Sequence, residues 1–254
     1  MHSDIRIWEE FGFEGMRKAG KLASQTLDYI EPFVKEGVST LYLNDLCEKF
    51  IRDNGAIPAP LNYKGYPKAT CISLNNVICH GIPDENTILK HGDILNIDVT
   101  VILNGWYGDT SRMYKIDPIS VRAQKLIDTT YRALMESIDI VKPGVKLYEV
   151  GRKIEEITKP LNFSIVRDFC GHGIGREFHS APSVLHYENQ HVNDITLKEG
   201  MFFTIEPMIN AGSYETKILK DGWTAVTRDR QLSAQFEHTI GVTKDGYEIF
   251  TKSD

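Results

Sequence analysis

The fold is decided by residues 97–109, which read Ile-Asp-Val-Thr-Val-Ile-Leu-Asn-Gly-Trp-Tyr-Gly-Asp. The first seven are mostly apolar and β-branched, which is typical of a buried strand. Asn104-Gly105 follows, and this pair is the strongest short signal for a two-residue hairpin turn. A turn at these two residues pairs Thr100 with Asp109. The stretch therefore predicts an antiparallel β-hairpin.

The hairpin brings two acidic side chains together. Asp98 and Thr100 share a face of the first strand, and Asp109 points to that same face from the second. Asp98 and Asp109 are then diagonal neighbours about 7–8 Å apart. Two buried carboxylates repel each other unless a cation lies between them, so a shared metal ion is one interpretation. The other is a pair of solvent-exposed aspartates at a hairpin tip, which suits Asp109 better than Asp98.

A similar sequence pattern occurs again later in the chain. Residues 89–98 resemble residues 197–206, and this match places Asp98 on Glu206. Residues 35–38 resemble residues 142–145 at nearly the same offset, which indicates a duplicated unit. Glu237 lies in another apolar, strand-like run, and the duplication predicts that Glu206 and Glu237 lie on a second hairpin that faces the first. Four carboxylates that converge would balance two divalent cations, an arrangement known from hydrolytic enzymes.

Each half is expected to contain two helices followed by strands, because its apolar residues change from helical to alternating spacing. Helices grouped with antiparallel hairpins predict an α+β fold. We expect a single domain over residues 1–254, with an N-terminal extension over about 1–13 and pseudo-symmetric halves over about 14–117 and 118–250. The expected helices span about 16–34, 43–54, 121–141 and 147–159, and the expected strands 93–103 and 200–209.

Composition excludes several function classes. The net charge is -6 with scattered basic residues, which argues against DNA as a partner. We expect no membrane partner, because the N-terminus has no secretory signal and no apolar run approaches about 18 residues. No cysteines form a CxxC pair, so free thiols in a reducing cytoplasm are expected. These cysteines are Cys47, Cys71, Cys79 and Cys170.

Three histidines accompany the acids. His172 lies in the glycine-rich stretch 171–175, His179 follows seven residues later, and His80 precedes the first acidic strand. Each alone would be read as structural, but a neutral imidazole beside buried carboxylates is a common metal ligand. The remaining histidines are weaker candidates: His2, His91, His186, His191 and His238.

Asp98, Asp109, His172, Glu206 and Glu237, in this order and at these spacings, resemble the five-ligand site of the methionine aminopeptidases. The resemblance extends from about residue 16 to residue 250 and implies the duplicated pita-bread fold. The short spacings after His172 leave no room for the helical insertion of type II enzymes, so the chain resembles the bacterial type I form. The most specific matching stretches are residues 96–99, 108–112, 171–175 and 235–239.

The resemblance implies two divalent metal ions per chain, drawn from Mn²⁺, Fe²⁺, Co²⁺, Ni²⁺ and Zn²⁺. One ion would bind Asp98 and Asp109. The other would bind Asp109, His172, Glu206 and Glu237, and Asp109 and Glu237 would each contact both ions and so bridge the pair. A metal-bridging water or hydroxide would attack the scissile carbonyl.

The resemblance also implies roles around the substrate. Glu206 would be the general base and proton shuttle, and His179 would donate a hydrogen bond to the carbonyl oxygen. His80 would contact the scissile amide or its leaving nitrogen. Many bacterial relatives have a cysteine where this chain has Pro60, which alters the rim of the pocket. The methionine side chain would lie among Tyr63, Tyr66, Cys71, Phe178 and Trp223.

The implied function is metal-dependent removal of the initiator methionine from nascent proteins whose second residue is small. We expect a cytoplasmic monomer that acts on emerging N-termini, with docking near the ribosomal exit tunnel left open. One alternative is an X-Pro aminopeptidase or prolidase-like dipeptidase, which shares the ligands but carries a large extra N-terminal domain. The other is a non-catalytic binding module, whose members lose metal ligands that this chain retains.

Overall fold

The computed structural model describes residues 5–192 and 194–253, so residues 1–4 of the expected N-terminal extension lie outside the described residues. The helices are α1 (Glu10–Ile30), α2 (Thr40–Asp53), α3 (Val121–Asp139) and α4 (Tyr148–Thr158), with short 3-10 turns at Glu31–Phe33, Tyr63–Gly65 and Lys159–Leu161. The strands are β1 (Ile57–Pro58), β2 (Cys71–Leu74), β3 (Val77–Cys79), β4 (Ile94–Leu103), β5 (Trp106–Lys115), β6 (Ser164–Ile165), β7 (Gly171–Gly173), β8 (Ser180–Val184), β9 (Phe202–Ile205), β10 (Met208–Asn210), β11 (Thr216–Ile218), β12 (Ala225–Thr227), β13 (Ser233–Gln235), β14 (His238–Val242) and β15 (Tyr247–Ile249).

The predicted hairpin is present as β4 and β5. Thr100 pairs with Asp109 across the two strands, which confirms the expected register. Asn104 and Gly105 have φ values of 52° and 76°, the left-handed conformation that a tight hairpin turn of this kind requires. The register therefore follows from the turn, and it fixes which side chains of β4 and β5 face the interior.

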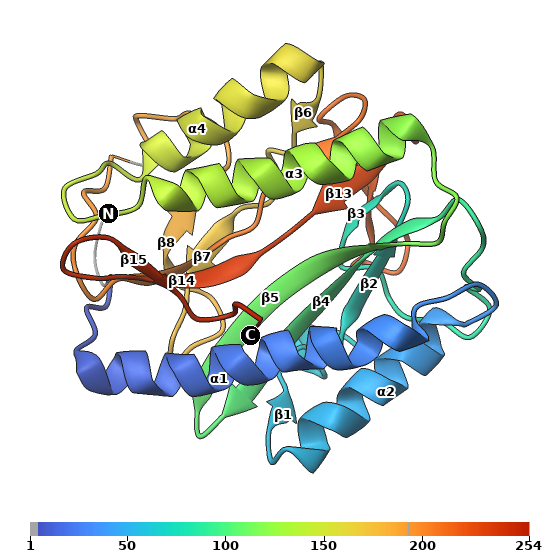
Figure 1. Cartoon of the computed structure of the whole chain (residues 1–254), viewed down its shortest axis with the longest axis horizontal. Helices are drawn as coiled ribbons and strands as arrows, with labels where there is room; N and C mark the ends of the chain where they lie inside the picture. The colour runs from blue at the N-terminus through green and yellow to red at the C-terminus, as the bar shows by residue number, and fades with distance from the viewer. Residues whose placement is uncertain (1–4, 193, 254) are drawn as a thin grey trace.

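The helices form two pairs that cover antiparallel strands, as expected for a duplicated α+β fold. In Figure 1, α1 and α2 flank the sheet of the first half, and α3 and α4 lie on the opposite side of the molecule over the second half. Each half has its own apolar core. Leu27, Leu43 and Ile97 belong to the first core, whereas Leu126 and Phe203 belong to the second.

Helix α1 differs from the prediction at both ends. It begins at Glu10 rather than near residue 16, because Phe13 in its first turn is anchored on Phe202 with the ring centroids 4.8 Å apart. It ends at Ile30 rather than at residue 34. Pro32 has no N–H and disfavours a helix interior, so the chain tightens there into a 3-10 turn.

The expected strand over residues 200–209 is split in two. Strand β9 pairs with β14, and β10 pairs with β13, both antiparallel. Glu206 and Pro207 separate β9 from β10, and Pro207 cannot donate to a ladder. The two acidic strands therefore lie side by side as expected, but a long excursion that contains β11 and β12 joins them in place of a tight turn.

The two halves meet along β5 and the segment that follows β13. The N–H of Glu237 donates to the carbonyl of Ser111 at 3.1 Å, and Thr239 Oγ1 donates to the carbonyl of Asp109 at 2.7 Å. Figure 1 shows β5 and β14 running side by side through the middle of the molecule. This junction brings acidic residues from the two halves together. Among the described helices, none has the length and apolar character needed to cross a membrane.

Candidate metal centre and substrate cleft

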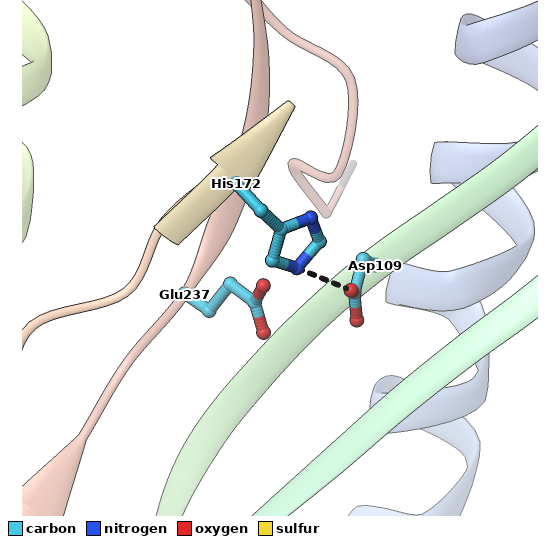
Figure 2. Close-up of side chains that lie close together, drawn as sticks. All are labelled: Asp109, His172 and Glu237. Atoms are coloured by element: carbon cyan, nitrogen blue, oxygen red, sulfur yellow. Dashed lines mark ion pairs between the residues drawn. The ribbon is translucent and has the colours of Figure 1, made fainter. Parts of the chain in front are cut away.

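Three side chains converge at the junction of the halves. Asp109 comes from β5, His172 from β7, and Glu237 from the short extended link between β13 and β14; Figure 2 shows them pointing toward one another. One ligand atom from each lies within 4.8 Å of the others, and His172 Nε2 is 3.5 Å from Asp109 Oδ2. This spacing suits a single metal ion held by two carboxylates and one imidazole.

The two other predicted ligands line the same cavity. His172 Nε2 is 3.7 Å from Glu206 Oε1. Asp98 lies opposite Cys71 in the β2–β4 pair and faces the cavity, which has a volume of about 400 Å³. The structure thus brings all five predicted metal-binding residues to one cavity, although only three of them meet the tight spacing described above.

Burial makes this acidic cluster unfavourable without cations. Burial, followed by the charge of Asp109, raises the pKa of both Asp98 and Glu237 well above the usual range. Burial raises the pKa of Glu206 to about 7. Burial lowers the pKa of His172, but its contact with Asp109 and the charge of Glu206 outweigh burial and raise that pKa overall. Protons or metal ions must therefore neutralise part of the negative charge.

The residues present fit divalent metal ions. Four carboxylates and one imidazole are hard and borderline donors of the kind that first-row divalent ions prefer. Among the described residues that line the cavity, Lys64 is the one Lys or Arg, and it is a side chain that the sequence prediction did not include. The charge of the acids is therefore not balanced by protein cations.

Neighbouring polar groups orient these acids. Thr100 Oγ1 donates to Asp109 Oδ1 at 2.7 Å. Thr204 Oγ1 donates to Glu206 Oε1 at 2.9 Å, and Gln235 Nε2 donates to Glu206 Oε2 at 3.2 Å. Sequence reasoning did not assign these three residues to the site. Each lies two positions from an acid on the same strand or strand extension, so the alternation of side chains was a usable signal.

His179 and His80 lie in the same cavity as the acids. His179 Nδ1 is 3.0 Å from the Tyr63 hydroxyl. Burial, followed by the charge of His172, lowers the pKa of His179 to about 4, so its ring is neutral at pH 7. Burial also lowers the pKa of His80, whose ring meets Phe169 edge-on with centroids 5.4 Å apart. Both imidazoles are therefore neutral side chains at the wall of the cavity.

Aromatic rings form the rest of the cavity wall. The Tyr63 and Phe178 ring centroids are 4.8 Å apart, and those of Tyr66 and Trp223 are 5.2 Å apart. Cys71 lies with them, so all five side chains expected around a methionine line the cavity. The cavity is also lined by residues that the prediction did not include: Lys64, Cys79, Asp168, Phe169, Cys170 and Met208.

Comparisons with known proteins agree with this geometry. A model of metallopeptidase family M24 matches residues 14–244. Over 250 residues the chain is 59% identical to a methionine aminopeptidase of Rickettsia prowazekii (strain Madrid E), covering 98% of this chain and 96% of that one. It is 52% identical over 239 residues to a methionine aminopeptidase of Escherichia coli (strain K12), covering 94% and 90%.

Solved structures give the same result. The crystal structure of methionine aminopeptidase from Rickettsia prowazekii superimposes with a TM-score of 0.95 at 58% identity, covering 98% of this chain and 100% of that one. Prolidase from Pyrococcus furiosus gives a TM-score of 0.77 at 22% identity and covers 98% of this chain but 66% of that one, which shows a shared fold alone. The chain belongs to metallopeptidase family M24 and, within it, to the methionine aminopeptidases.

Proposed function

We propose that this enzyme removes the initiator methionine from newly made proteins whose second residue is small. The observation that carries the proposal is the convergence of Asp109, His172 and Glu237 within 4.8 Å beside an aromatic cavity. We further propose that it acts as a cytoplasmic monomer on the N-termini of nascent chains, including those leaving the ribosome, and that neither DNA nor a membrane is its partner.

Two divalent ions from among Mn²⁺, Fe²⁺, Co²⁺, Ni²⁺ and Zn²⁺ fit the donor set. Asp98 would help to hold one, His172 and Glu206 would help to hold the other, and Asp109 and Glu237 would be shared by both. This assignment is supported by the excess of carboxylates over protein cations in the cavity. When bound, such ions polarise a carbonyl group and lower the pKa of water, which provides a nucleophile near neutral pH.

The protein's own groups would then hold the substrate and move protons. With the Tyr63 phenol donating to His179 Nδ1, the ring proton lies on Nε2, which can donate to the scissile carbonyl oxygen as it gains negative charge. The Glu206 carboxylate would take the proton of the attacking water and pass it to the leaving amine. His80, on the cavity wall, would contact the amide nitrogen that leaves.

The cavity accounts for the choice of substrate. An unbranched thioether packs favourably against aromatic rings and a thiol, which here are the rings of Tyr63, Tyr66, Phe178 and Trp223 and the thiol of Cys71. The next residue of the substrate would lie against the acidic cluster and the two histidines, so a long side chain there would collide with them.

The test uses chelated protein to which each of the five ions is returned. The ions bound per chain are counted, and hydrolysis of Met-Ala-Ser, Met-Arg-Ser and Ala-Pro-Ser peptides is measured. We expect two ions per chain and fast release of methionine from Met-Ala-Ser alone. Equal rates on Met-Ala-Ser and Met-Arg-Ser would contradict the proposed specificity, and preferential cleavage of Ala-Pro-Ser would identify an X-Pro peptidase instead.

A further inference from the structure

The strongest unassigned feature is the buried histidine that follows β8. His186 is 1% exposed and lies two residues past the end of that strand. Burial lowers its pKa to about 3, so the imidazole is neutral and one ring nitrogen is free to accept a hydrogen bond. The main-chain N–H of Glu206 donates to His186 Nε2 at 3.1 Å.

The main-chain N–H of Glu206 lies outside both neighbouring β-ladders. The β9–β14 pair ends with Ile205 opposite His238, and the β10–β13 pair begins with Met208 opposite Gln235. Glu206 lies in the gap between the two ladders. An unpaired main-chain donor inside a protein is unfavourable, so an acceptor at this point stabilises the interrupted strand.

The buried imidazole of His186 also leaves one of its own ring nitrogens without a hydrogen bond. His186 Nδ1 has no hydrogen-bond partner among the described residues. Because Nε2 accepts, the proton lies on Nδ1, where it is an unpaired buried donor. An apolar side chain would avoid that penalty. The hydrogen bond from the Glu206 N–H to His186 Nε2 compensates for this unpaired donor. A histidine at this position is therefore explained by its contact with the main chain of Glu206.

The same glutamate is held at its other end. Thr204 and Gln235 donate to the two oxygens of the Glu206 carboxylate, and Thr204 Oγ1 also accepts from the main-chain N–H of His172 at 3.0 Å. Main chain and carboxylate are thus fixed by separate groups. A rotation of the main chain at Glu206 would displace the carboxylate from its place 3.7 Å from His172 Nε2.

We propose that His186 is a positioning residue for this reaction: through its Nε2 it fixes the main chain of Glu206 and thereby the direction of the Glu206 carboxylate. This rests on the proposed function, in which Glu206 binds metal and moves a proton. Among the described residues, His186 makes no hydrogen bond to any other predicted metal ligand, and its contact with Glu206 is through the main chain.

The test compares two substitutions. His186→Gln keeps an acceptor near the position of Nε2, whereas His186→Leu has none. In His186→Leu we expect kcat on Met-Ala-Ser to fall about tenfold or more with a smaller change in KM, and metal affinity to weaken. His186→Gln should restore most of both. Hydrogen exchange at the Glu206 amide, followed by NMR, should accelerate in His186→Leu and stay slow in His186→Gln.

Leu134→Ala is the matched control. Leu134 is a buried residue of α3, lies in the same apolar core as Val184 and Ile205, and takes no part in the site. It should lower stability and leave kcat and the relative exchange rate at Glu206 unchanged. The proposal is overturned if His186→Leu keeps the wild-type kcat and a slow Glu206 amide, or if His186→Gln is as impaired as His186→Leu. The exchange measurement needs no activity, so it still tests the contact if the wild-type enzyme fails to cleave Met-Ala-Ser.

Discussion

At the scale of single residues, two histidines seven positions apart have different surroundings. His172 contacts two carboxylates, at 3.5 Å and 3.7 Å. His179 instead bonds Tyr63 at the cavity wall, with its second nitrogen directed away from that bond. The first environment suits a metal ligand. The second suits a donor whose value is greatest when charge develops on a substrate oxygen.

With the proposed pair of metal ions, His179→Ala should keep both ions and lose about a hundredfold in kcat, with a smaller change in KM. His172→Ala should lose a metal ion. Metal stoichiometry and steady-state kinetics on the two variants check this. If His179→Ala emptied a metal site while His172→Ala kept both ions, the two roles would have to be exchanged.

Residue types, spacing and the internal repeat were enough to predict that four carboxylates gather at one cavity, because alternation along a strand fixes which side chains share a face. The choice of His172 among the histidines came from the family resemblance. Strand alternation does not predict the contact that His186 makes. Its partner is a main-chain N–H at a strand interruption, and the position of that interruption depends on how β9 and β10 pair with other strands. Contacts to main chain across such distances leave no pattern in the sequence.

At the scale of elements, the β4–β5 hairpin lies directly against helix α1. Gly108 faces the helix so closely that a Cβ there would lie 2.4 Å from the main-chain oxygen of Ala19. Gly108 is therefore required by close packing, and its neighbour Asp109 depends on that packing for its position in the site.

Gly108→Ala should push α1 away from β5, lower the free energy of unfolding by about 1–3 kcal/mol or more, and reduce activity through Asp109. Urea unfolding and kcat measure the two effects. Gly246→Ala is the control, because a Cβ at Gly246 meets no atom within 4 Å. Similar effects of both substitutions would show that the contact between α1 and β5 does not control the position of Asp109.

The order and type of the main elements could be predicted, since helical and alternating patterns are local. The excursion with β11 and β12 could not. β11 pairs with β12, and β12 pairs with β3 of the first half, so their existence depends on contacts distant in sequence. Trp223, in the turn between them, reaches the cavity only through that pairing, and its place was expected from family resemblance alone.

At the scale of the whole molecule, the duplication explains why the site lies where it does. Each half contributes an acidic pair from its own antiparallel strands, and the halves join through β5 and the residues that follow β13. The junction excludes water from ionisable groups on both sides. Glu237 faces the acidic cluster, whereas its neighbour His238 faces away and bonds Thr251 Oγ1 at 2.9 Å.

His238 is a partly buried histidine that predicts how the stability of the metal-free protein depends on pH. Burial, followed by the charges of Arg112 and Lys252, lowers the pKa of His238 to about 4 from an ordinary value of 6.5. The folded state therefore resists protonation that the unfolded state accepts. The stability contributed by neutral His238 is complete above pH 6.5 and is lost as the pH falls from 6.5 toward 4, by roughly 3 kcal/mol at most.

His238→Gln removes this titration, so its unfolding free energy should fall less steeply between pH 6.5 and pH 4 than that of the wild type. Urea unfolding in the presence of a chelator, at several pH values in that window, measures the difference. His191→Gln, at an exposed histidine, is the control for loss of an imidazole and should keep the wild-type slope. Parallel curves for wild type and His238→Gln would mean that His238 is protonated equally in the folded and unfolded chains, contrary to its burial at the junction of the two halves.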